Sequence, residues 1–437
     1  MSGVANRSAL KDKDELYRCI ISQLLYDGHH DQALSLIQVI MPNPECPPSG
    51  RLLSVFQKGL HAESAEKAEQ EKQTQISHVV LAPGGTVAPT ASSGIDLEYE
   101  SDVLIMTPEA VNYDTVYVTS HKDPCKTTGF SYDGQYVATG SVDASIKLLD
   151  VDKMLIKGTS DAANESADQH PVIKTYYDHV NEITCIKFHP FDTFMASGAK
   201  DKMVKVYDYS KTASKKAVRT LEDVEPIKDV SYHPGGEWLL VACRHPVLRM
   251  YNLENGSCFV AANPREHHTK FVNAVDYAPN GRLYASGDKA GNIKIWDGVS
   301  SRCIQNILGA HGGESICSVR FSKNSRYLLT AGKDSLVKLW EIGTSRDILT
   351  YTGAGSQKMT KRVPAVFNHT EDYVFFPDEG ATSLCCWSSR NGERMRLLPL
   401  VHSRSVRFIA HSPVHAGMMT CGDDYRARFW YAKPLES

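Results

Sequence analysis

The chain contains 437 residues, and its 48 Lys and Arg against 51 Asp and Glu give a formal net charge of −3, which argues against a surface coated for nucleic acid. It has no apolar run of about 18 residues and no apolar signal-peptide core in Met1–Leu10, so neither a membrane span nor a signal peptide is predicted. The 11 cysteines form no Cys-x-x-Cys pair, which predicts a reducing compartment, no metal site and no cofactor.

Residues 1–65 are predicted to form a small all-α module. Apolar residues recur at helical spacing up to Leu25, Gly28 is suited to end that helix, and Asp31 can cap a second one. A helical core of about 50 residues usually needs further support, so we expect homodimerisation or docking to a partner. A helical cap packed on the main domain is the alternative. The residues expected to carry the dimer contact are Leu16, Ile20, Ile21, Leu24, Leu25, Leu34, Ile37 and Phe56.

Residues 66–115 are predicted to form a flexible, partly acidic linker. Pro, Gly, Ser, Thr and Ala dominate Ala82–Gly94, a composition typical of flexible segments. Acidic residues then gather in Ile95–Ala110. A solvated tether explains them most simply, and a docking strip for a basic surface is the alternative.

From residue 116 onward, one sequence motif recurs. Its version at Thr330–Glu341 consists of a strand, a polar turn at Asp334 and a second strand ending at Trp340. An aromatic or apolar residue closes each repeat at intervals of about 43–58 residues, at Leu149, Tyr207, Tyr251, Trp296, Trp340, Trp387 and Trp430. These repeats resemble the four-stranded blades of the WD40 family in their period and in their recurring residues. The resemblance implies an all-β, seven-bladed WD40 propeller over residues 116–437.

The two ends of the repeat region predict how the ring closes. The last repeat stops just after Trp430, too early for a fourth strand, whereas a strand at Val116–Ser120 precedes the first repeat. We expect Val116–Ser120 to complete the last blade, because closure removes the exposed edges of a linear array. The long first interval indicates an insertion at residues 152–170, which we expect to be a surface loop between blades one and two.

The WD40 resemblance also implies a buried relay of His, Ser or Thr, Asp and Trp within a blade. Such a set resembles a hydrolase triad, but a set that recurs from blade to blade does not form the single prepared pocket of an enzyme. We therefore expect no catalytic residues and a structural relay. Blades five and seven contain all four relay residues, which are His311, Thr330, Asp334 and Trp340, and His402, Thr420, Asp424 and Trp430.

The remaining blades depart from this pattern. Blade one (His121, Thr139, Asp143) and blade two (His179, Ser197, Asp201) lack the Trp, and blade four (His268, Ser286, Trp296) has Ala290 at the Asp position. Blade three has Val241 and His245, and blade six has Pro377 and Ala381, where Thr and Asp would stand. The sequence therefore predicts a full relay in only two blades and none in blades three and six.

Arginines gather late in the chain and predict a partner-binding sector on blades six and seven. An acidic peptide or a phosphate backbone would be its partner, and a solvated face is the alternative. The alternation in residues 426–428 places two of the arginines on one strand face. The candidates are Arg394, Arg396, Arg404, Arg407, Arg426 and Arg428.

Several segments are more specific for one family than the general repeat motif is. They are Leu16–Gly28, Gly94–Leu97, Tyr117–His121, Ile295–Ser300 and Arg426–Tyr431. They are similar to the WD-repeat, fifty-kilodalton subunit (subunit 1) family of the cleavage stimulation factor. The resemblance implies a nuclear, non-enzymatic scaffold or adaptor in pre-mRNA 3′-end cleavage and polyadenylation.

The same resemblance implies specific partners. The N-terminal helices would homodimerise, and the propeller would dock a helical-repeat scaffold subunit and other nuclear 3′-end processing proteins. An RNA-recognition subunit would be reached indirectly, so any RNA contact by this chain would be secondary. A WD40 substrate receptor of a ubiquitin ligase remains the alternative, with Leu16–Leu25 as the segment that would contact an adaptor.

Overall fold

The computed structural model describes residues 20–21, 24, 32–34, 36–37, 95, 112–158, 170–211, 214–355, 359–378 and 382–432. The chain divides into two units, Met1–Ala88 and Pro89–Ser437.

In the N-terminal unit, all of the described residues are helical. Ile21 and Ala33 are fully buried, whereas the side chain of Leu34 is 54% exposed. Ile20, Leu24 and Ile37 are half-buried. The other residues expected to carry the dimer contact, Leu16, Leu25 and Phe56, lie outside the described residues.

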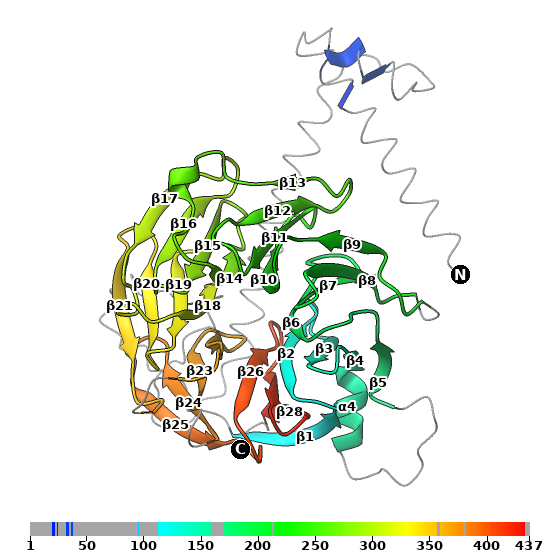
Figure 1. The fold of residues 1–437 in the computed structure, drawn as a ribbon. Helices are drawn as coiled ribbons and strands as arrows, with labels where there is room; N and C mark the ends of the chain where they lie inside the picture. The colour runs from blue at the N-terminus through cyan, green and yellow to red at the C-terminus, as the bar shows by residue number, and fades with distance from the viewer. Residues whose placement is uncertain are drawn as a thin grey trace, which may run out of the picture. The chain divides into compact units, whose positions relative to one another are not determined.

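In the described part of the second unit, seven four-stranded antiparallel sheets form a propeller (Figure 1), so the predicted fold is confirmed. Blade one contains β2 (Cys125–Phe130), β3 (Tyr136–Ser141), β4 (Ile146–Asp150) and β5 (Val172–Tyr176). Blade two contains β6 (Ile183–Phe188), β7 (Phe194–Ala199), β8 (Met203–Asp208) and β9 (Arg219–Glu222). Blade three contains β10 (Ile227–Tyr232), β11 (Trp238–Cys243), β12 (Arg249–Asn252) and β13 (Cys258–Phe259).

The remaining blades follow in chain order. Blade four contains β14 (Val272–Tyr277), β15 (Leu283–Asp288), β16 (Ile293–Asp297) and β17 (Cys303–Ile307), and a 3-10 turn, η2 (Pro264–Glu266), precedes it. Blade five contains β18 (Ile316–Phe321), β19 (Tyr327–Gly332), β20 (Val337–Glu341) and β21 (Arg346–Tyr351). Blade six contains β22 (Val366–Phe367), β23 (Tyr373–Asp378), β24 (Ser383–Ser388) and β25 (Arg394–Pro399). Blade seven contains β26 (Val406–His411), β27 (Gly417–Gly422), β28 (Arg426–Ala432) and β1 (Tyr113–Ser120).

Blade seven closes the ring as the sequence predicts. Its strand order is β1-β28-β27-β26, and β1 pairs antiparallel with β28 from Tyr113 opposite Ala432 to Ser120 opposite Arg426. The closing strand begins three residues before the predicted Val116. The first and last segments of the propeller unit thus share one sheet, and their pairing closes the ring.

The insertion after the first repeat differs from the prediction in two ways. Its first part is a helix, α4 (Val151–Gly158), and it lies between β4 and β5, within blade one rather than between blades one and two. The helix forms because Val151 and Met154, three residues apart on one face, are buried in the cluster that contains the apolar residues of β1 and β28. Residues 159–169 lie outside the described residues.

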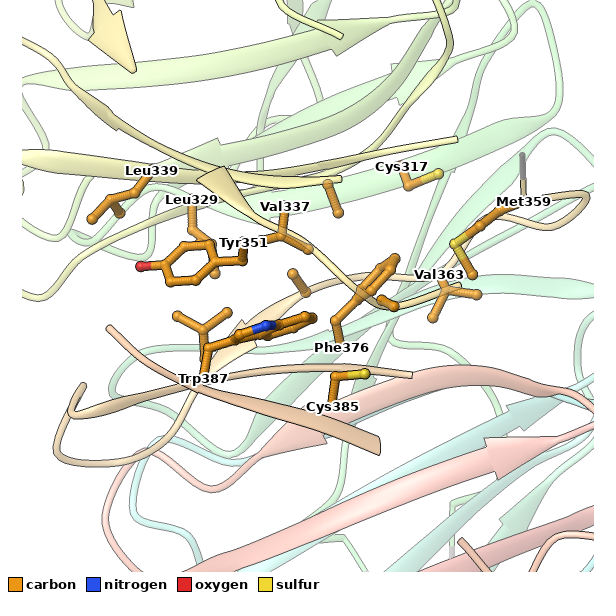
Figure 2. Packing of buried hydrophobic residues seen from close by; sticks show 14 of the residues in the cluster. Cys317, Leu329, Val337, Leu339, Tyr351, Met359, Val363, Phe376, Cys385 and Trp387 are labelled. Atoms are coloured by element: carbon orange, nitrogen blue, oxygen red, sulfur yellow. The ribbon is translucent and has the colours of Figure 1, made fainter. Parts of the chain in front are cut away.

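Apolar side chains fill the space between neighbouring blades. Figure 2 shows the cluster between blades five and six, in which Tyr351 lies near Trp387 with their ring centroids 5.8 Å apart. Ile95 belongs to this cluster and is 1% exposed, although the sequence places it in the flexible linker. Its N–H donates to Glu371 Oε2 at 3.1 Å, and its carbonyl accepts from Asn324 Nδ2 at 2.5 Å. Ile95 and Tyr113 are therefore parts of the propeller unit.

Candidate functional site

In blade five, the four relay residues form one chain of hydrogen bonds. His311 Nδ1 lies 2.9 Å from Asp334 Oδ2, and its Nε2 lies 2.9 Å from Thr330 Oγ1. Trp340 Nε1 donates to the same Thr330 oxygen at 2.8 Å. Asp334 Oδ1 also accepts the N–H of Leu336 at 3.1 Å and so fixes the turn between β19 and β20. Each buried polar group has a partner, and leaving one without a partner would cost about 1–3 kcal/mol.

Blade seven repeats this arrangement. His402 Nδ1 lies 2.9 Å from Asp424 Oδ1 and its Nε2 lies 2.8 Å from Thr420 Oγ1, while Trp430 Nε1 donates to Thr420 at 2.8 Å. Burial lowers the pKa of His402 more than the hydrogen bond that its Nδ1–H donates to Asp424 raises it, so the imidazole is held neutral.

Blade four also contains a full relay, which corrects the prediction that only blades five and seven do. Asp288 supplies the carboxylate instead of position 290, with Oδ2 lying 3.1 Å from His268 Nδ1. Ser286 Oγ lies 2.6 Å from His268 Nε2 and accepts from Trp296 Nε1 at 2.8 Å.

A glycine explains why the sequence pattern missed Asp288. In blades five and seven, Gly332 and Gly422 occupy the place two residues after the relay threonine. A Cβ at Gly332 would lie only 2.4 Å from His311 Nδ1, so the bare glycine leaves room for the carboxylate of Asp334 to reach His311 from the turn. In blade four, Asp288 itself stands two residues after Ser286 and contacts the histidine directly. An Asp in place of this glycine is the signal that would have identified the third relay.

Blades one and two contain shortened relays. In blade two, His179 bonds Asp201 at 2.8 Å and Ser197 at 2.7 Å, but the buried hydroxyl of Tyr207 has no hydrogen-bond partner among the described residues. In blade one, Ser145 stands between His121 and Asp143, because its hydroxyl donates to Asp143 Oδ1 at 2.5 Å and accepts from His121 Nδ1 at 2.9 Å. Burial lowers the pKa of His121, but the nearby side chains of Asp143 and Cys125 outweigh it and raise the pKa to about 9.

Blades three and six are held by other contacts. In blade three, Tyr251 donates to Asp223 Oδ2 at 3.2 Å, and in blade six Trp387 Nε1 donates to the carbonyl of Thr352 at 3.1 Å. Ala381 lies outside the described residues. Because a His–carboxylate pair with a Ser or Thr recurs in five blades, the arrangement fits a structural, non-catalytic role. Within the described ranges, no group of three or more His, Cys, Asp or Glu is placed to hold a metal ion, and no described helix is long and apolar enough to cross a membrane.

The six candidate arginines lie in three different places. Arg394 and Arg396 stand on β25, the outer strand of blade six. Arg404 and Arg426 are exposed near the relay turn of blade seven, where Asp424 accepts the N–H groups of Ser403 and Arg426. The other two, Arg407 and Arg428, are buried. The alternation in residues 426–428 thus joins one exposed and one buried arginine.

Sequence reasoning missed a basic cavity among the inner strands, with a volume of 170 Å³. Thr184 and Phe408 contribute to its wall together with a single carboxylate, Glu182. Its cationic lining residues are Lys126, Lys200, Lys228, Lys361, Arg362 and Arg407. We call this cavity the channel mouth. Residues from distant repeats form it, so the only sequence signal is a basic residue at the second position of β2, β10 and β26.

Comparisons with known proteins cover both parts of the chain. Residues 8–64 match the family model for the cleavage stimulation factor subunit 1 dimerisation domain. Four segments, 114–150, 171–208, 263–297 and 301–341, match the WD domain, G-beta repeat. The WD-repeat match agrees with blades that the strand pairing defines independently.

The relatives differ in how much of the chain they match. Cleavage stimulation factor subunit 50 of Arabidopsis thaliana is 36% identical over 425 residues, which is 95% of each chain. Pre-mRNA-processing factor 19 of Oryza sativa subsp. japonica is 24% identical over 46% of this chain and 34% of its own. The ribosome biogenesis protein WDR12 homolog of Drosophila pseudoobscura pseudoobscura is 26% identical over 59% of this chain and 64% of its own. The chain therefore belongs to the family of WD-repeat subunits of the cleavage stimulation factor, a family that acts in mRNA processing.

Proposed function

We propose that the chain is a non-enzymatic scaffold or adaptor subunit of the nuclear machinery that cleaves and polyadenylates pre-mRNA. The observation that carries this proposal is the match of the cleavage stimulation factor subunit 50 of Arabidopsis thaliana over 95% of the chain, helical module and propeller together. The repeated relays use their polar groups to hold blades, which leaves the propeller as a rigid platform for other proteins.

Self-association is assigned to residues 1–65. The match of residues 8–64 to a dimerisation domain supports this assignment. Ile21 and Ala33 are fully buried within one chain, whereas Leu34 leaves 54% of its side chain exposed. An exposed leucine beside a small helical core provides apolar surface that a second copy can cover. Leu34 is therefore placed in the dimer contact, and Ile21 in the core of each copy.

The exposed arginines are assigned to partner contact. Arg394, Arg404 and Arg426 are exposed, and each presents a planar guanidinium suited to carboxylates of a partner protein. Arg396 is half-buried and donates to Asn112 Oδ1 at the start of the closing strand. The helical-repeat scaffold subunit of the cleavage stimulation factor is the proposed partner, and the RNA-recognition subunit is held indirectly through it.

Affinity purification from nuclear extract, followed by mass spectrometry, tests the proposed function. The tagged full-length chain is expected to recover other subunits of the cleavage stimulation factor and further 3′-end processing proteins. A parallel purification with the triple variant Arg394→Ala, Arg404→Ala, Arg426→Ala is expected to recover less of the scaffold subunit. Recovery of a ubiquitin-ligase adaptor without any processing protein would contradict the proposal.

A further inference from the structure

The channel mouth is built by one irregularity that recurs around the ring. In six blades the innermost strand shifts register by one residue just after it begins, so that its second residue is skipped in the pairing with the next strand. Such a bulge re-aims a side chain. The skipped residues are Lys126, Thr184, Lys228, Asn273, Cys317 and Arg407. Four of them, from blades one, two, three and seven, line the channel mouth.

Blade six contributes a cation by another route. Its innermost strand, β22, is only two residues long, and Arg362 from the segment before it reaches across to other blades. Arg362 Nε donates to the Cys317 carbonyl at 2.7 Å, Nη1 to the Lys228 carbonyl at 2.6 Å and Nη2 to Asp229 Oδ2 at 2.9 Å. Partners from blades three and five thus fix this guanidinium in place, next to Lys228.

The carboxylates around the channel mouth do not balance its cations. Lys200 pairs with Glu182 at 2.6 Å, and Asp229 is engaged by Arg362. Asp423 is held by Arg407 through two hydrogen bonds and lies 3.8 Å from Lys126. Lys228 forms no ion pair with a described carboxylate.

Lys228 shows the effect of this excess charge. Burial is the largest cause, and together with the neighbouring cations Arg362, Arg244 and Lys200 it lowers the pKa of Lys228 to about 8. Burial and the charge of Arg407 likewise lower the pKa of Lys126. An ammonium group crowded by other cations in a partly dry site gains most from an anionic partner, since the attraction is screened less there than in water.

We propose that the channel mouth binds the phosphoryl group of a phosphorylated serine or threonine in a partner protein. A volume of 170 Å³ is below the roughly 300 Å³ of a pocket for a drug-sized ligand, and it suits a single anionic group on a short stem. A phosphoryl group brings nearly two charges and three acceptor oxygens, which match cations that converge from several blades. A nucleic acid backbone would need a groove along which successive phosphates could lie, rather than one small cavity lined by cations from several blades.

This inference goes beyond the proposed function and does not depend on it, because peptide binding is measured with the purified chain alone. The probe is a degenerate peptide library with phosphoserine at its centre, compared with the same library carrying serine and with a single-stranded RNA oligonucleotide. Binding is followed by fluorescence anisotropy. The double variant Lys126→Ala, Lys228→Ala is compared with Lys216→Ala, an exposed lysine between β8 and β9 that does not line the cavity.

The phosphorylated library is expected to bind at least about tenfold more tightly than the serine library, the change that one charge-assisted hydrogen bond supplies. The double variant should lose this preference, whereas Lys216→Ala should keep it. Both variants should unfold at the same temperature as the wild type. Equal binding of the two libraries, or a preference that survives in the double variant, would overturn the proposal. A loss of RNA binding alone in the double variant would overturn it in favour of a nucleic acid site.

Discussion

Tyr113 on the closing strand donates a hydrogen bond of 3.1 Å to Nε2 of His411 on the innermost strand of the same blade. The direction follows from the other ring nitrogen, because Nδ1 lies 2.8 Å from the Ser412 carbonyl and must carry the proton. The imidazole is also stacked on Phe375 of blade six, with ring centroids 5.9 Å apart. Ring closure therefore depends on a neutral His411 as well as on the backbone pairing of β1 with β28.

This contact predicts that the propeller loses stability in acid. Burial is the largest cause, and together with the positive charge of His369, His415 and Lys323 it lowers the pKa of His411 to about 3, whereas the unfolded value is near 6.5. Between these pH values the unfolded chain binds more protons than the folded one, so the stabilisation is complete above about 6.5 and is lost as pH falls toward 3. The loss is at most about 1.4 kcal/mol per pH unit.

Urea unfolding of the wild type and of His411→Gln from pH 7 to pH 4 measures the contribution of His411 to the free energy of unfolding. The wild type is expected to be more stable at pH 7, with an advantage that shrinks as the pH falls. A difference between the two proteins that stays constant with pH would show that His411 does not titrate as described.

The blade-four relay predicts that Asp288→Ala destabilises the propeller about as much as Asp334→Ala. Each change leaves a buried histidine without its carboxylate, at a cost of about 1–3 kcal/mol for each polar group left without a partner. Asp347→Ala is the matched control, because Asp347 is half-exposed and only 3.9 Å from Lys338, a pair worth less than about 1 kcal/mol. Thermal unfolding of the three variants gives the comparison. If Asp288→Ala destabilised the protein no more than Asp347→Ala does, the relay in blade four would not contribute to the stability of the propeller.

The position of Ile95 predicts that a single residue far before the first blade stabilises blades five and six. Ile95→Ala removes apolar volume from a cluster in which the side chain is 1% exposed, and such changes cost about 2–5 kcal/mol in a well-packed core. The loss should appear as a lower unfolding temperature and as faster exchange of the residue-95 amide proton that is bonded to Glu371. Val299→Ala, at a 93% exposed residue, should change neither. Equal behaviour of the two variants would contradict the anchoring of Ile95.

The exposure of Leu34 predicts a variant that dissociates the dimer without unfolding its helices. Leu34→Asp places a charge in the proposed contact and should give a molecular mass near 48.4 kDa by light scattering, whereas the wild type should give twice that value. Gln32→Asp, at an exposed residue near Leu34 in the same unit, is expected to leave the dimer intact. A wild-type mass of a single chain, or a dimer that persists in Leu34→Asp, would remove Leu34 from the interface.

Much of the fold can be predicted from the sequence because each repeat ends in a recognisable residue pattern. The closing residues from Leu149 to Trp430 locate the blades, and the missing strand after Trp430 indicates the partner for β1. The module at residues 8–64 is likewise marked by an apolar helical pattern.

What the sequence did not reveal depends on side-chain reach and on distant contacts. Asp288 takes the place of the turn carboxylate because it stands where blades five and seven have Gly332 and Gly422, and a pattern of fixed positions does not detect this exchange. Alternation places Arg426 and Arg428 on one face but does not tell how deeply each is buried. Lys126 and Lys228 are about a hundred residues apart in sequence, and only the bulges of β2 and β10 bring them to the same cavity.

The measurement that tests the central claim most directly is a two-step purification of the chain from nuclear extract. Two copies with different tags are expressed together, each tag is used in turn, and the final fraction is quantified by mass spectrometry. A dimeric adaptor of 3′-end processing predicts that both tagged copies and the other cleavage stimulation factor subunits appear in that fraction. A fraction with one tagged copy alone, or with no 3′-end processing protein, would contradict the claim.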